Sequence, residues 1–127
     1  MKYYFDTSIW LDLFENREEY NLPKGKLVQE LVNKIIKDNE VIIFTELVIN
    51  EIKKIGYSDF EIESLFKQFD KILINIEPSK KGEIKIPNAD ALHALIARNN
   101  KAVLVTRDYH FQKLLDIIKP KKPEEIT

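Results

Sequence analysis

Four short apolar runs, separated by segments of helical periodicity, constrain the fold of this chain more than any other feature. The runs cover residues 2–5, 41–44, 72–76 and 102–105 and are rich in β-branched and aromatic side chains, which is typical of buried strands. Between the runs, apolar residues recur every three or four positions, which indicates amphipathic helices. Strands that alternate with helices predict βαβ crossovers and therefore a parallel sheet.

The expected fold is a three-layer α/β/α sandwich around a central parallel sheet of four or five strands, in a single domain over residues 1–127. Helices are expected near 9–14 and at 26–38, 45–55, 59–69, 88–100 and 109–115, with long loops at 15–25 and 77–87. Residues 117–119 are the candidate fifth strand, at one edge of the sheet. Pro123 is expected to stop regular structure.

Composition narrows the class of protein. The chain has no cysteine, which excludes disulfides and thiolate zinc sites. It has no apolar run of the ~20 residues that a membrane span requires, and its first residues, MKYYFDTSIW, lack the apolar stretch of a signal peptide. We therefore expect a cytoplasmic protein that makes no contact with a membrane. The net charge of −1 argues against a scaffold held to nucleic acid by overall positive charge, but a metal site can still receive a phosphate locally.

Acidic residues lie beside the edge at which parallel α/β sheets bind ligands. Asp6 comes directly after the first strand and Asp108 shortly after the fourth, while Asp90 lies in the first turn of a late helix. Each acid alone has a structural reading, as a helix cap, a helix-dipole partner or a turn residue. Thr7 or Ser8 is the expected cap of the first helix. Because such readings do not explain why the acids share one edge, we expect their carboxylates to converge there.

Helix geometry selects one further acid, on the helix that Thr45 is expected to cap. At about 100° per residue, Glu51 falls within the apolar arc of that helix, whereas Glu46 falls outside it. A carboxylate on a buried face is costly unless something compensates for it. Glu51 is therefore the better candidate for a site, and Glu46 is explained as a helix-dipole partner.

Several carboxylates within a few ångström repel one another, so either their pKa values rise or a cation lies among them. Oxygen ligands, without cysteine and without a paired-histidine motif, favour a hard ion such as Mg²⁺ or Mn²⁺. Such an ion lowers the pKa of bound water and neutralises charge on a phosphoryl group. The residues thus predict metal-dependent phosphoryl chemistry, and they do not define the substrate.

Four motifs, in their order and spacing, resemble those of PIN-domain nucleases, and particularly the short VapC-type toxins and their archaeal relatives. The motifs are YYFDTSIW at the start, TELVINEI after the second strand, NADALHALIA in the late helix and VTRDYHF after the fourth strand. The ending KPKKPEEI is also similar. The resemblance covers nearly the whole chain and implies a PIN-like fold and a Mg²⁺- or Mn²⁺-dependent ribonuclease.

The resemblance assigns the family's four catalytic and metal-binding acids to Asp6, Glu51, Asp90 and Asp108. It implies that the first three hold the principal ion and that Asp90 and Asp108 hold a second ion or the attacking water. The hydroxyls that support the metal site fall on Thr7, Ser8 and Thr106. One departure concerns the fourth acid, because many relatives have Asn at the position of Asp108 and Asp two residues later, where this chain has His110.

A few other residues have two readings. His93 lies three residues after Asp90, on the same helix face, and could contact substrate or the acids, or simply pack. Arg107 is a candidate phosphate ligand, as are the lysines of the second long loop, which are Lys80, Lys81 and Lys85. Trp10 is expected to pack in the core or at a dimer contact rather than stack on a base, and His110 is expected at the surface.

The implied function is hydrolysis of RNA phosphodiester bonds by the toxin of a type II toxin–antitoxin pair, leaving 5′-phosphate and 3′-hydroxyl ends. The resemblance further implies a cognate antitoxin and a homodimer. Two alternatives share the fold: a housekeeping RNA-processing nuclease without an antitoxin, and a catalytically silent domain that binds RNA or a partner. A phospho-acceptor domain fits poorly, since haloacid-dehalogenase-like phosphatases have a second Asp where this chain has Ser8.

Overall fold

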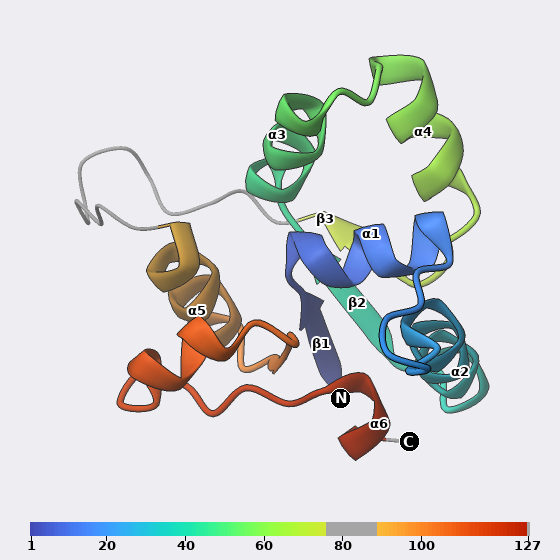
Figure 1. Ribbon diagram of the computed structural model, residues 1–127. Coiled ribbons are helices and arrows are strands. Elements are labelled where there is room, and N and C mark those ends of the chain that lie inside the picture. The colour runs from blue at the N-terminus through green and yellow to red at the C-terminus, as the bar shows by residue number, and fades with distance from the viewer. Residues whose placement is uncertain (76–88, 127) are drawn as a thin grey trace.

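A four-stranded parallel sheet forms the centre of the protein (Figure 1), as seen in a computed structural model that describes residues 1–75 and 89–126. The strands are β1 (Lys2–Phe5), β2 (Val41–Phe44), β3 (Leu73–Asn75) and β4 (Val103–Val105), in the spatial order β3-β2-β1-β4. Tyr3 of β1 pairs in parallel with Ile42 on one side and Val103 on the other. The predicted α/β class and parallel sheet are confirmed.

Helices connect the strands and cover both faces of the sheet. They are α1 (Thr7–Glu15), α2 (Lys24–Lys37), α3 (Glu46–Ile55), α4 (Asp59–Lys67), α5 (Ala89–Asn99), the 3₁₀ helix η1 (Tyr109–Leu114) and α6 (Pro123–Ile126). Successive residues of a strand point to opposite faces. The ring of Phe5 contacts Trp10 of α1, and the ring of Tyr4 contacts His93 of α5. The helices α1 and α5 therefore lie on opposite faces, which gives the three expected layers.

An aromatic cluster packs α1 and α4 together over the sheet. Trp10 is fully buried, and four phenylalanine rings surround it with centroids 4.8 to 5.8 Å away, those of Phe5, Phe14, Phe66 and Phe69. Rings at such distances add to the free energy of burial. Trp10 therefore has the packing role that its spacing indicates.

The C-terminal segment differs from expectation. Residues 117–119 form no strand, and the chain meets the sheet through a single parallel bridge between Lys121 and Val105. Pro123 begins α6 rather than stopping regular structure. Proline is favoured in the first turn of a helix, because its missing N–H would lack an intrahelical partner there in any case.

One predicted helix cap is wrong, and the other is confirmed in its position but makes no capping bond. The cap of α1 is Asp6, whose side chain accepts a hydrogen bond from the Ile9 amide, and not Thr7 or Ser8. Thr45 is the N-cap residue of α3, but its side chain makes no capping bond. Both departures concern polar side chains near the carboxyl edge of the sheet.

Two sequence predictions lie outside the described residues: the second long loop at 77–87 and its lysines, Lys80, Lys81 and Lys85. Within the described ranges, none of the helices has both the length and the apolar character that a bilayer-crossing segment needs.

Candidate active site

Asp6 lies at the carboxyl end of β1 and is almost fully buried. Its Oδ1 accepts hydrogen bonds from the Ser8 hydroxyl at 2.8 Å and from the Ile9 amide at 3.1 Å, and its Oδ2 accepts one from the Thr106 hydroxyl at 2.5 Å. Burial raises the pKa of Asp6, and the three donors oppose that rise without cancelling it. The carboxyl end of β1 therefore holds a buried carboxylate whose charge the hydrogen bonds compensate only in part.

Thr106 joins the ends of β1 and β4. It follows β4 directly, donates to Asp6, and accepts a hydrogen bond from the Asp108 amide at 3.1 Å. Because both strands are parallel, their carboxyl ends meet at one edge, and a short buried side chain can bridge them. The bridge fixes the backbone that carries Asp108 relative to Asp6.

Glu51 lies on α3, half-buried, and faces α1 and α5. Its Oε1 accepts hydrogen bonds from the Thr7 hydroxyl at 2.5 Å and from His93 Nε2 at 2.7 Å. Burial alone would raise the pKa of Glu51, but the hydrogen bonds from His93 and Thr7 outweigh burial, so the pKa lies below its ordinary value. Glu46, on the same helix, is exposed. The structure therefore agrees with helix geometry that Glu51 lies on the inner side of α3 and Glu46 on the outer side.

Asp90, Asp108 and His110 form the tightest group of potential metal ligands among the described residues. One ligand atom from each lies within 4.8 Å of the others. The imidazole Nδ1 of His110 is 2.8 Å from Asp108 Oδ1. Burial and then the charge of Asp108 raise the pKa of Asp90, as repulsion between neighbouring carboxylates requires.

The four predicted acids gather around this edge of the sheet, although Asp6 and Glu51 are not part of the tight group. Asp6 is linked to Asp108 through Thr106, and the charge of Glu51 acts on Asp90. The predicted supporting hydroxyls also lie here. Ser8 and Thr106 donate to Asp6, and Thr7 donates to Glu51.

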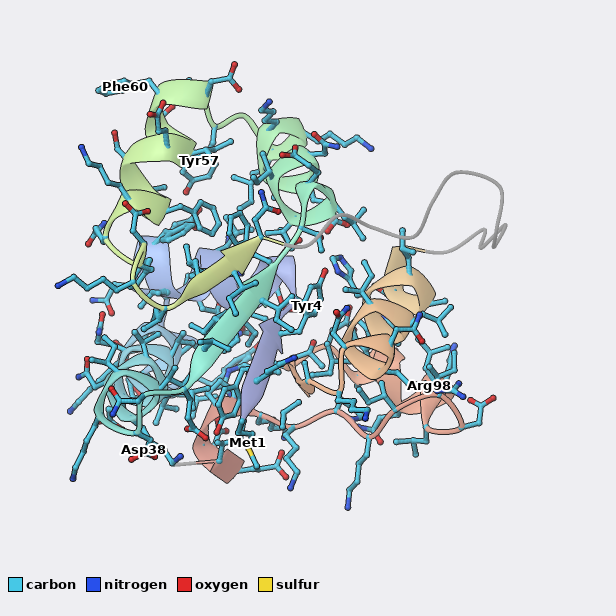
Figure 2. The ribbon with its side chains drawn as sticks, turned by 180° about the vertical axis from the view of Figure 1, so that it is seen from behind. Met1, Tyr4, Asp38, Tyr57, Phe60 and Arg98 are labelled. Carbon is cyan, nitrogen blue, oxygen red and sulfur yellow. The ribbon has the colours of Figure 1, made fainter. Side chains whose placement is uncertain are left out.

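His93 is buried between the sheet and the acids. Its Nδ1 is 2.5 Å from the Tyr4 hydroxyl, whose oxygen is 3.3 Å from the Thr45 hydroxyl. Figure 2 shows Tyr4 on β1, on the side of α5. His93 is 2 % exposed and faces Glu51 rather than the solvent. Of the readings from the sequence, this position favours a buried histidine that contacts the acids over one that contacts substrate.

Arg107 makes its contacts away from the acids. Its Nη1 and Nη2 lie 2.8 and 2.7 Å from the two carboxylate oxygens of Glu124 on α6, and its Nε lies 3.9 Å from the buried Asp12. The Nη1 contact is a hydrogen bond, whereas Nη2 and Nε are buried and have none within the described residues. A guanidinium that is 11 % exposed and paired with Glu124 is poorly placed to reach a phosphate. Its position favours a structural role over the predicted role in substrate binding.

Sequence reasoning missed Tyr4 and assigned His110 to the surface alone. A signal for Tyr4 existed, because the two-residue period of a strand places Tyr4 and Asp6 on the same face. No comparable signal existed for His110, which is exposed and reaches Asp90 only because η1 follows β4 beside α5.

The donor set fits a divalent cation. Carboxylate oxygens dominate it. Burial raises the pKa values of both Asp6 and Asp90, and the charge of Asp108 adds to the rise at Asp90. A bound cation would reverse that rise, because it favours the ionised form of each carboxyl group. Hard ions such as Mg²⁺ and Mn²⁺ take oxygen ligands of this kind.

The fold and the site define a class: parallel α/β proteins with a cluster of acids at the carboxyl edge of the sheet. Residues 3–115 match the PIN domain family, so the chain belongs to that family. PIN domains are generally nucleases that use divalent metal ions, which makes this chain a member of the nuclease class.

One solved structure shows the same fold. It is VapBC2 from Rickettsia felis bound to a DNA fragment from their promoter, and one of its chains is 21 % identical with a TM-score of 0.69, over 96 % of this chain and 98 % of that chain. No curated protein has a significant sequence match to the chain.

Proposed function

We propose that this chain is a ribonuclease that depends on Mg²⁺ or Mn²⁺, and that it is the toxin of a type II toxin–antitoxin pair. The observation that carries the proposal is the meeting of Asp6, Glu51, Asp90 and Asp108 at one edge of the sheet, with the pKa values of Asp6 and Asp90 raised. Packing of the fold gives no reason to gather four acids in one place, whereas a phosphodiester-cleaving site built on divalent ions uses carboxylates as the ligands of those ions.

Each acid has a distinct part in this proposal. Asp6 and Glu51 are held by hydrogen bonds from the protein, and we assign their remaining lone pairs to the cation. Asp90 and Asp108 lie close enough to share one ligand and to orient a water molecule for in-line attack. A bound divalent ion would activate that water and neutralise charge on the phosphate. No side chain becomes covalently attached to the RNA.

His110 bears on the choice of ion. Its Nδ1 is directed at Asp108, and its ring lies within the tight group with Asp90. Imidazole is a good ligand for transition metals and a poor one for Mg²⁺, which takes oxygen ligands and water. Mn²⁺ is therefore the favoured ion of the two.

The proposed partners are an antitoxin, a second copy of the chain and an RNA substrate, all in the cytoplasm. The likeness to a chain of VapBC2 supports an antitoxin partner. RNA as the substrate rests on the resemblance of the four motifs to VapC-type toxins. A housekeeping nuclease and a silent PIN-like domain remain the alternatives.

The test is cleavage of structured RNA with Mn²⁺ or Mg²⁺ by the natural chain and by Asp6→Asn. The substitution keeps the shape of the side chain but removes the charge, so we expect cleavage to be abolished while the fold is retained. Asp12→Asn is the matched control, because Asp12 is also a buried acid of α1 but pairs with Arg17 and Arg107 rather than with the site. It should retain cleavage.

The outcomes separate the alternatives. Equal cleavage by the natural chain and Asp6→Asn would reject the mechanism. Metal binding without cleavage of any RNA would favour the silent domain. Cleavage without growth arrest on expression, and with no neighbouring gene product that relieves it, would favour the housekeeping nuclease.

A further inference from the structure

A buried chain of hydrogen bonds ends on the Glu51 carboxylate. It runs from Thr45 to Tyr4 (3.3 Å), from Tyr4 to Nδ1 of His93 (2.5 Å) and from Nε2 of His93 to Oε1 of Glu51 (2.7 Å). Thr45 and Tyr4 are fully buried, and His93 is almost so. Buried polar groups are costly unless they are paired, and here each one is paired with the next.

The direction of these bonds follows from the last acceptor. Oε1 of Glu51 already accepts a hydrogen bond from the Thr7 hydroxyl, and a carboxylate oxygen has no hydrogen to donate, so it can only accept. Nε2 of His93 must therefore donate. In the neutral ring Nδ1 then accepts, so the Tyr4 hydroxyl donates to it and accepts in turn from Thr45. The chain holds His93 in one tautomer and one orientation.

The two oxygens of Glu51 consequently differ. Oε1 takes two donors, from Thr7 and His93. Oε2 has no hydrogen bond from the part of the chain that the structure describes. When the protein's own donors occupy one oxygen of a carboxylate, the other oxygen is the one that can bind a ligand. His93 also lies one helical turn from Asp90, so a single face of α5 carries an acid of the site and the ring that orients another.

We propose that His93, fixed by the Tyr4 hydroxyl, is a positioning residue that turns Oε2 of Glu51 toward the bound cation. This inference rests on the proposed function for the identity of the site as a metal site. A carboxylate held by an oriented imidazole is a stiffer and better ligand than a free one, and removing such an outer partner typically weakens metal binding by about 10- to 100-fold.

The experiment compares two adjacent tyrosines of β1. Tyr4→Phe removes the hydroxyl that fixes His93. Tyr3→Phe is the control. It removes the hydroxyl of a ring that is equally buried but lies on the opposite face of the sheet, where the hydroxyl donates to Glu40. Mn²⁺ affinity is measured by calorimetry on the intact chain. We expect Tyr4→Phe to bind Mn²⁺ several-fold more weakly and Tyr3→Phe to bind as the natural chain does.

Two further measurements separate positioning from packing. ¹⁵N NMR of the metal-free protein should show His93 protonated at Nε2 in the natural chain, and a mixture of tautomers in Tyr4→Phe. His93→Leu should lose about 10-fold or more in Mn²⁺ affinity. His93→Gln, whose amide can still donate to Glu51, should recover most of that loss. If His93→Leu does not fold, the Tyr4→Phe result alone decides.

The inference is overturned if His93 carries its proton at Nδ1 alone, or if Tyr4→Phe binds Mn²⁺ as tightly as Tyr3→Phe. Neither result depends on RNA cleavage. A chain that shows the expected tautomer and affinities but cuts no RNA would refute the proposed function and leave the positioning role standing. A chain that cuts RNA but fails these measurements would refute the positioning role and leave the proposed function standing.

Discussion

Neighbouring carboxylates in this protein are compensated in different ways, and the difference sets what each can do. Glu51 receives two hydrogen bonds on one oxygen and has a lowered pKa. Asp90 lies beside another acid, and its pKa is raised by burial and by that neighbour. A group of the first kind is a ready ligand at neutral pH, whereas one of the second kind gains most from a cation.

At the scale of a single residue, His110 offers a direct prediction about metal choice. Replacing it in His110→Asn removes the imidazole ligand and leaves an amide oxygen. We expect the ratio of Mn²⁺ to Mg²⁺ affinity to fall by roughly tenfold, equivalent to about 1.4 kcal/mol. Competition calorimetry with both ions measures that ratio. An unchanged ratio would mean that His110 does not contact the ion.

At the scale of elements, α4 is held to α1 by aromatic packing. Phe66 of α4 is buried and contacts Trp10, Phe14 and Phe44, whereas Phe60 of the same helix is 78 % exposed and points outward in Figure 2. Phe66→Ala should therefore cost about 3–5 kcal/mol of unfolding free energy. Phe60→Ala should cost close to nothing. Urea unfolding of the two variants tests this, and equal costs would contradict the packing described.

The short helix α6 is tied to the end of β4 by the ion pair of Arg107 with Glu124. Burial would raise the pKa of Glu124, but the hydrogen bond and charge of Arg107 outweigh it and lower the pKa. An acid whose folded-state pKa is lowered stabilises the fold above its unfolded-state pKa and loses that contribution as the pH falls through the folded-state value.

Glu124→Gln should accordingly cost about 1 kcal/mol at pH 7, a figure that allows for screening by solvent. The cost should shrink as the pH falls below the ordinary pKa of glutamate, about 4.3. Urea unfolding at pH 7 and at pH 3.5 measures both values, with the exposed Glu18→Gln as the control. A cost that is the same at both pH values would show that the ion pair does not stabilise α6.

The sequence predicted the elements better than their ends. The strands β1 and β2 lie where the apolar runs placed them, because a continuous run of β-branched and aromatic residues is typical of a buried strand. The candidate strand at 117–119 was wrong, because pairing with the sheet depends on where the chain returns, which local pattern does not encode. The cap of α1 was wrong because Asp6 serves the helix and the site together.

Some residues of the candidate site could also be predicted from the sequence, and others could not. Glu51 could be selected because helical periodicity exposes a charge on an apolar face. The roles of His93 and Arg107 could not be assigned, because each depends on a partner far along the chain, namely Tyr4 and Glu124. Such contacts are set by tertiary packing, and no periodic pattern in the sequence indicates them.

At the scale of the whole molecule, the site exists only when the sheet is complete. Its acids come from position 6 to position 108, and the elements that carry them meet at the carboxyl edge of β1, β2 and β4. The overall charge of −1 contributes little attraction to RNA, so in the proposed function the bound ion supplies affinity for the phosphate. Because the acids that would hold the ion meet only in the folded chain, the proposal predicts that metal binding stabilises the fold.

Anomalous X-ray diffraction from crystals soaked in MnCl₂ is the measurement that tests the central claim most directly. Data collected at the manganese absorption edge locate the ion independently of any assumption about ligands. We predict a peak among the four acids, within bonding distance of Asp90 and of at least one of Asp6 and Glu51. A peak found only elsewhere on the surface, or no peak at a saturating concentration, would contradict the account.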